Sequence, residues 1–223
     1  MTSKAIETQK TKLCINAISE TVSVSFTASS HKISRAAGDW TAAPNAIVAG
    51  MVVSTDAAGN LGPFLVASVT TSDIVIDTTA SLAQGFANAI VDGTAASHVI
   101  KAGLPVKEMT TFSGLDGTAS TIDTTSMDST SKEFLMGLRN NGGFKGDFNF
   151  VGDDPGQVAM LAAIGTRALT GFHLRMSNNS IFEFSAYVLG RSLSGGVDAK
   201  ADTNFTLQIS GDVTYDAAFV TGA

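Results

Sequence analysis

The sequence has little cysteine, little charge and no long apolar segment. Cys14 is the only cysteine among 223 residues, which excludes an internal disulfide and a metal cluster built on thiolates. We expect Cys14 to be a small buried residue of a strand. No run of about 18 apolar residues occurs, so no membrane-spanning helix is expected. Residues 1–5 lack the apolar part of a secretory signal, and we expect the chain to be made and kept in a cytoplasm.

The charge of the chain is sparse and acidic. Charged residues make up only 15% of the sequence, and the net charge is −6. So few charges are unusual for a monomer whose whole surface meets water. The sequence therefore predicts that much of the surface contacts other protein. The acidic balance argues against ordinary nucleic-acid binding, which needs basic groups on the phosphates.

Residues that could carry chemistry are scattered along the sequence. The three histidines do not occur at the spacing of a metal site; they are His31, His98 and His173. Ser192 and Ser194 stand in a segment without the Gly-x-Ser-x-Gly pattern of a nucleophile, and we expect a loop there. Asp153 and Asp154 could form a carboxylate pair, but a helix start explains them better. The sequence therefore predicts no enzyme, no cofactor and no metal site.

The first half of the chain predicts short strands. Apolar and hydroxyl residues alternate from Glu20 to Ala28, which indicates a half-buried strand. From residue 36 to residue 107 the composition shifts to Ala, Gly, Val and Thr, and apolar stretches are separated by turn residues. These stretches are Ile47–Val53, Phe64–Val69 and Ile74–Ile76. We interpret the segment as an inserted β module, with Trp40 as a core residue at its entrance.

The second half predicts a larger core and a single helix. Ten of the thirteen phenylalanines lie at or beyond Phe112, and strands are expected at 144–151 and 181–189. Between these strands we expect a short helix that begins with Asp154 as N-cap and Pro155 as its first residue, and ends at Gly165. An apolar stripe is expected to face the sandwich, and it consists of Val158, Leu161 and Ala162.

A long closing strand is predicted from Asp202 to Tyr215 by strict alternation. Its even-numbered positions are polar and include no Lys or Arg. Such a strand at a sheet edge recruits further strands. We therefore expect identical neighbours to pair with it.

Taken together, these patterns predict a mainly β fold. We expect a β-sandwich or barrel with one short helix, plus an inserted small β module. Residues 1–35 are expected to supply N-terminal strands of the main core, residues 36–107 the module, and residues 108–223 the main sandwich.

A series of motifs follows in order through the second half: Asp123-x-Thr125, Phe134 to Gly137-Leu138, Asp154-Pro155-Gly156-Gln157, Phe182-x-Phe184, Gly195-Gly196-Val197 and Ser210-Gly211. In this order they resemble the tail tube proteins of long-tailed, lambda-like (siphovirus-type) bacteriophages, the major tail proteins. The chain departs from the family at Leu135-Met136-Gly137, where members often have Ile-Pro-Gly. The segment 36–107 lies outside the shared core.

The resemblance implies a structural protein of the virion tail, assembled in the host bacterial cytoplasm. Proteins of this family form hexameric rings that stack into a hollow tube. Strands of every subunit line the bore, through which genomic DNA is ejected without specific binding. The implied partners are further copies of the chain and the tape measure, tail terminator and distal tail proteins; no membrane partner is implied.

Two groups of residues are candidates for this role. The polar face of the closing strand could line the bore, since a conduit for DNA must not grip phosphates; the candidates are Asp202, Asn204, Thr206, Gln208 and Ser210. The same face could instead point outward into solvent. The loop from Ser126 to Arg139 becomes abruptly apolar, and we expect it to dock on a neighbouring subunit through Phe134, Leu135, Met136 and Leu138. The alternative is that these side chains cover their own sandwich.

Other classes of protein fit parts of this pattern. A pilus or surface-layer subunit would also be a self-assembling β-sandwich, although an export signal would be expected. A carbohydrate-binding β-sandwich is a further alternative, and it would carry aromatic platforms on a concave face.

Overall fold

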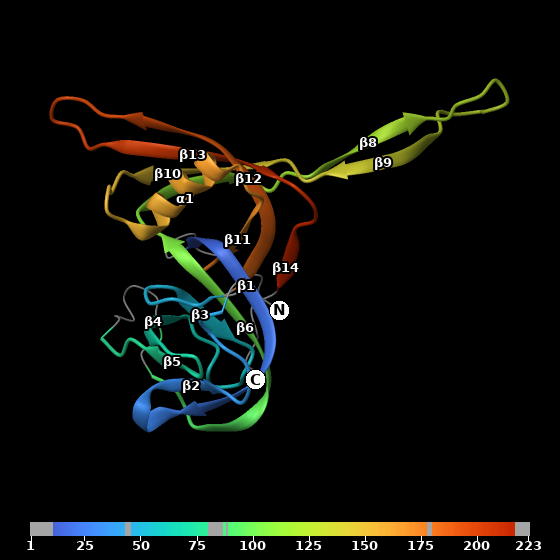
Figure 1. Cartoon of the computed structure of the whole chain (residues 1–223). Coiled ribbons are helices and arrows are strands. Elements are labelled where there is room, and N and C mark those ends of the chain that lie inside the picture. Colours follow the sequence, from blue (N-terminus) through green and yellow to red (C-terminus); the bar gives the residue numbers. More distant parts are fainter. Residues whose placement is uncertain (1–10, 43–45, 80–86, 88, 178–179, 217–223) are drawn as a thin grey trace, which may run out of the picture.

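The structure, a computed structural model, describes residues 11–42, 46–79, 87, 89–177 and 180–216. It is mainly β, with one α-helix in the described part of the chain (Figure 1), as the sequence predicts. The elements are β1 (Lys12–Thr27), η1 (Ala28–Ser30), β2 (Lys32–Arg35), β3 (Val52–Thr55), β4 (Phe64–Val69), β5 (Asp73–Ile76), β6 (Gly93–Val106), β7 (Met109–Gly114), β8 (Thr118–Asp123), β9 (Phe134–Asn140), β10 (Gly143–Asn149), α1 (Pro155–Thr166), β11 (Thr170–Arg175), β12 (Ile181–Ser194), β13 (Asp202–Ile209) and β14 (Thr214–Asp216).

The first six strands build a closed barrel, the lower part of the molecule in Figure 1. Their order is β2, β5, β4, β3, β6 and β1, and the barrel closes because β1 also pairs with β2, with Val24 opposite Arg35. Trp40 is 1% exposed inside this barrel. Its indole N–H donates to the carbonyl of Ser72 at 3.0 Å. Trp40 is therefore a core residue, as the sequence predicts.

β1 and β6 are long enough to leave the barrel and enter the sandwich. Near its start β1 pairs with β11 on one side and β6 on the other, so that Leu13 lies opposite both Leu174 and Val106. Leu13 and Val106 belong to the sandwich core, whereas Val24 and Phe26 of β1 belong to the barrel core. The strands before residue 36 thus contribute to both cores. The division of the chain at residues 36 and 107 remains a proposal.

The sandwich continues the sheet from β1 through β11, β12, β13, β10 and β7. Phenylalanine rings fill the space that this curved sheet encloses with α1. Phe184 lies 5.7 Å, between ring centroids, from both Phe144 and Phe172, and Phe148 lies 5.8 Å from Phe205. The aromatic residues of the second half therefore form the core predicted from their distribution.

The closing strand differs from its prediction in length and place. β13 ends at Ile209, and the chain turns at Gly211, whose φ is +89°, before the short β14. The alternation itself is correct, since the odd-numbered residues of β13 are buried. However, β13 lies between β10 and β12, with Thr206 opposite both Lys145 and Gly190. The prediction that this strand recruits neighbours is therefore wrong, and within the described sheet the free edges are β7 and the short β14.

Four consecutive residues fasten the start of α1 to the sheet. Asp154 is the N-cap, as predicted, and its carboxylate accepts from the backbone N–H of Gln157 at 2.9 Å. Pro155 occupies the first turn. The Gln157 side chain donates to the carbonyl of Asn149 at 2.9 Å and accepts from the N–H of Val151 at 3.1 Å. The helix start is thus tied to the end of β10.

The apolar stripe predicted for α1 is on the wrong face. Val158, Leu161 and Ala162 are exposed, whereas the buried residues are Gly156, Gln157, Met160 and Ala163. The reason is that the helix contains no charged residue, so hydrophobicity alone does not distinguish its two sides.

Gly156 is required by a close approach of backbones. A Cβ at this position would overlap the carbonyl oxygen of Pro105 and lie 2.6 Å from the Cα of Val106. Gly156→Ala is therefore expected to destabilise the fold by about 1 to 3 kcal/mol, the cost of overpacking, although Ala is the better helix former. Urea unfolding measures this. Gly165→Ala is the control, since its Cβ would meet nothing within 4 Å, and it should stabilise by up to about 1 kcal/mol. Equal effects of the two changes would contradict the account.

Candidate assembly surfaces

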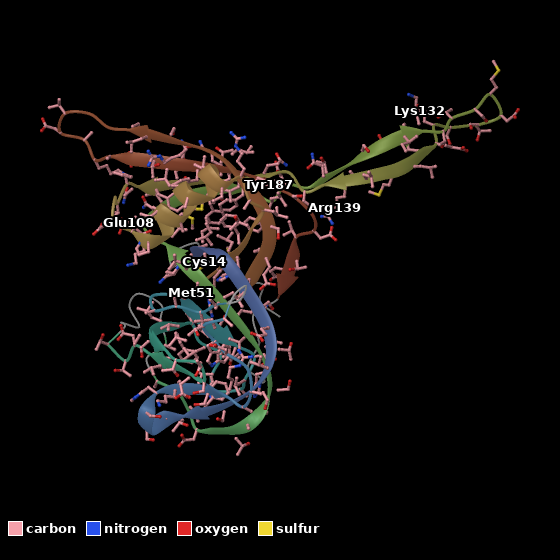
Figure 2. All side chains as sticks on the ribbon, in the orientation of Figure 1. Cys14, Met51, Glu108, Lys132, Arg139 and Tyr187 are labelled. Atoms are coloured by element: carbon pink, nitrogen blue, oxygen red, sulfur yellow. The ribbon has the colours of Figure 1, made fainter. Side chains whose placement is uncertain are left out.

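Strands β8 and β9 form a two-stranded ribbon, here called the arm (residues 118–140), which projects from the sandwich (Figure 1). The pairing runs from Thr118 opposite Asn140 at the root to Asp123 opposite Phe134 near the tip. In Figure 2, Arg139 lies near the root of the arm and Lys132 near its tip. The arm is reached from β7 and returns into β10.

The apolar side chains of the arm are exposed. The exposed fractions are 55% for Ile122 and Phe134, 61% for Leu135, 83% for Met136 and 91% for Leu138. These residues do not cover their own sandwich, so that alternative is excluded. The loop predicted from Ser126 to Arg139 is also corrected, because residues 134–139 lie on β9 and the connection between the strands is residues 124–133.

The arm has apolar residues on both of its faces. Directly paired residues share a face, so Ile122 and Leu135 lie together on one face. Phe134 and Met136 lie together on the opposite face. We call this opposite face, with Phe134 and Met136, the first face of the arm. An irregularity between Ala119 and Thr121 shifts the register, so that Arg139, opposite Ala119, joins this first face. The first face therefore carries Phe134 and Met136 between Asp123 at the tip end and Arg139 at the root.

Such a ribbon is poorly suited to water. An isolated two-stranded hairpin is marginally stable because it has no core. Covering one large apolar side chain gains about 1.5 to 3 kcal/mol. Contact of both faces with other apolar surfaces would therefore stabilise the arm. The arrangement of the arm favours a role in contact with neighbouring molecules.

Strands β12, β13 and β10 form the upper part of the sheet in Figure 1, here called the upper sheet. Its outer face is mainly polar. On β13, Thr206 and Gln208 are exposed and Asp202 and Asn204 are half-buried, and Ser210, just beyond the strand, is exposed. The side chains between them point into the sandwich core, so this face points away from it. Most of their partners on neighbouring strands are polar, namely Lys145, Asp147 and Asn149 of β10 and Ser192 and Ser194 of β12, while Gly143, Gly190 and the exposed Tyr187 complete the set.

The basic residues beside this polar face have acidic partners. The Nζ of Lys145, opposite Thr206, lies 3.7 Å from a carboxylate oxygen of Asp147. The Nζ of Lys200 lies 2.9 Å from a carboxylate oxygen of Asp202. The polar face of β13 has no basic residue, but basic residues do lie beside it. Paired lysines nevertheless attract phosphates less than lone ones do.

The other residues singled out from the sequence lie in structural positions. Cys14 is buried on β1, as predicted, and burial raises the pKa of its thiol to about 12. Burial, with the nearby charges of Arg175 and Lys101, lowers the pKa of His173 to about 3, so this imidazole is neutral. Ser192 and Ser194 lie on β12 and not in the predicted loop.

No group of three or more His, Cys, Asp or Glu residues in the described part of the chain could hold a metal ion. No helix in this part of the chain has the length and hydrophobicity needed to cross a membrane.

Among the solved structures that match this chain, two come from gene transfer agent particles. A chain in the virion of a native gene transfer agent particle matches with 15% identity and a TM-score of 0.45, over 51% of this chain and 88% of that chain. A chain in the tail of an empty particle with C6 symmetry matches with 17% identity and the same TM-score, over 52% and 88%. No protein-family model and no curated protein matches the sequence.

Sequence reasoning identified the apolar residues of β9 but missed the arm. The missed signal is the pair of segments 118–123 and 134–140, each rich in strand-forming or apolar residues, on either side of the polar stretch 124–133. Met127, in that stretch, is fully exposed.

Proposed function

We propose that this chain is the subunit of a hollow tail tube, built from stacked hexameric rings, through which genomic DNA leaves a phage-like particle. The observation that carries the proposal is the arm, whose two faces both expose apolar side chains. Neighbours must cover both faces, and identical copies supply them through head-to-tail contacts that close into a ring. The free edge of β7 offers a further place for strand pairing.

In this assembly the polar face of the upper sheet lines the bore. Its leading residues are Asp202, Asn204, Thr206, Gln208 and Ser210. Uncharged polar groups and paired lysines fit a surface past which DNA slides, because each lone Lys or Arg contact with phosphate adds affinity that does not depend on sequence. The barrel of β1 to β6 lies below the sandwich in Figure 1, away from this polar face, and so outside the bore.

The proposal places the protein in the virion tail, with assembly in the host bacterial cytoplasm and no enzymatic role. Its partners are further copies of the chain, the tape measure, the tail terminator and the distal tail proteins. Of these, the contacts between copies are the ones that the exposed surfaces of the subunit support.

The purified chain is expected to form rings that polymerise end to end. Sedimentation velocity over a range of concentrations would follow association, and negative-stain microscopy would show whether the products are rings and tubes. Their symmetry gives the number of subunits. A folded chain that stays monomeric at high concentration, also with its tail-assembly partners present, would overturn the proposal.

A further inference from the structure

The outer side of α1 is an apolar surface with no cover among the described residues. Val158 is 49% exposed and Leu161 39%, and Leu169, just beyond the helix, is 49% exposed. The helix contains no charged residue along its twelve positions. A helix that is apolar on all sides is typical of one buried on all sides. The outer side of α1 therefore matches an apolar partner better than water, a phosphate or a sugar.

Charges flank this surface at both ends. Asp153 precedes the N-cap and Arg167 is the C-cap residue, and both are exposed. Fourteen residues at about 1.5 Å each separate them by about 21 Å along the helix axis. The first face of the arm has the opposite order from root to tip, with Arg139 at the root and Asp123 beside Phe134. Because of the register shift, Arg139 lies opposite Ala119, four residues of β8 from Asp123, so the two charges of the arm are about 13 Å apart along the ribbon. The two charge pairs therefore match in order, and an arginine in each pair supplies a long side chain that can span the difference in spacing.

We propose that the first face of the arm of one copy docks on the outer side of α1 of the next copy. In this contact Met136 covers Val158 and Phe134 covers Leu161, Arg139 approaches Asp153, and Asp123 approaches Arg167. β9 therefore runs antiparallel to the helix. The inference rests on the proposed function, since it names the contact by which copies join.

The occupant of α1 is a second copy because the arm points away from its own helix. α1 packs against β12, β6 and β1, while in Figure 1 the arm leaves the sandwich on the other side. The same chain thus supplies both surfaces at separate places, which gives a head-to-tail contact that can repeat around a ring.

A disulfide trap tests this contact. The double variant Met136→Cys, Val158→Cys is expected to form a ladder of cross-linked oligomers after mild oxidation, because a disulfide needs Cβ atoms within about 4.5 Å. Each single variant should remain largely uncross-linked, since Cys14 is buried and contributes no reactive thiol. The control is Met136→Cys with Val197→Cys, as Val197 is 96% exposed on the β12–β13 hairpin, away from α1. A ladder in the control equal to that in the test variant would overturn the proposal.

A charge exchange tests the orientation without cysteines. Arg139→Glu and Asp153→Lys are each expected to raise the concentration needed for assembly about fivefold, and the two together should restore it. Both side chains are exposed, so the monomer should keep its melting temperature. Additive losses in the double variant would contradict the antiparallel contact.

The failure of this contact and the failure of the proposed function give different results. A parent chain that assembles, while the trap gives no ladder and the charges show no coupling, would overturn only the contact between arm and helix. A parent chain that does not assemble would overturn the proposed function and the contact with it.

Discussion

A chain with Leu135→Ser and Met136→Ser is expected to remain monomeric at concentrations at which the parent forms rings. Leu135 and Met136 lie on opposite faces, so their loss removes about 3 to 6 kcal/mol from the contacts of each arm taken together, which lowers the association constant by about two to four orders of magnitude. In the free subunit these side chains are already 61% and 83% exposed. The melting temperature of the monomer should therefore hardly change. Sedimentation and thermal unfolding measure the two properties separately.

The matched control for this variant lies on the barrel. Val48 and Val91 are 49% and 60% exposed there, and their replacement by serine removes similar apolar surface without touching the arm. This control should assemble like the parent. The arm variant could instead assemble normally, or its monomer could lose thermal stability together with the loss of assembly. Either result would show that the arm is a structural part of the subunit and not a contact between subunits.

Local signals allowed the start of α1 to be predicted from the sequence. Asp154-Pro155-Gly156-Gln157 combines an N-cap, a first-turn proline and a side chain that binds loop backbone. Such bonds involve neighbours within a few residues. The need for glycine at position 156 was not visible, because the clash that excludes a side chain comes from Pro105 and Val106, about fifty residues earlier in the chain.

Closure of the barrel and the double role of two strands lay beyond the sequence pattern. The period of two in Glu20 to Ala28 indicates which side chains are buried, and Val24 and Phe26 are buried as expected. It does not indicate against which core. β1 serves the sandwich through Leu13 and the barrel through Val24 because β6 and β11 pair with it at different points. These pairings join residues far apart in sequence.

The candidate surfaces divide in the same way. Alternation correctly placed Thr206 and Gln208 on the polar face of β13, but the neighbours of that strand depend on the sheet order. The pattern therefore missed Lys145 beside Thr206. On the arm, the sequence identified the apolar residues. Their place on a projecting strand follows from the pairing of β8 with β9. That pairing is hard to see in the sequence because a ten-residue connection separates the two strands.

Lysines introduced on the polar face are expected to slow the passage of DNA. In the proposed tube, Thr206→Lys and Gln208→Lys add two positive side chains per subunit to the bore, and every ring repeats them. Each contact between a lysine and a phosphate strengthens binding and makes it dependent on salt. Thr206 already lies opposite Lys145, whose one carboxylate partner in that strand is Asp147. A second lysine there would exceed the available acid.

At low salt, particles assembled with this variant should therefore eject DNA at least about tenfold more slowly than the parent. The ejection rate should return toward that of the parent as rising salt screens the contacts. Time-resolved release of DNA from triggered particles measures the rate, and microscopy of the tubes establishes that assembly is intact. The control carries the same charge on the barrel, as Thr21→Lys with Ser23→Lys, two exposed hydroxyl residues on one strand. It should eject like the parent, because in the proposed tube the barrel lies outside the bore. Normal ejection through tubes that carry Lys at 206 and 208 would place the polar face of β13 on the outside, where added charge meets only solvent.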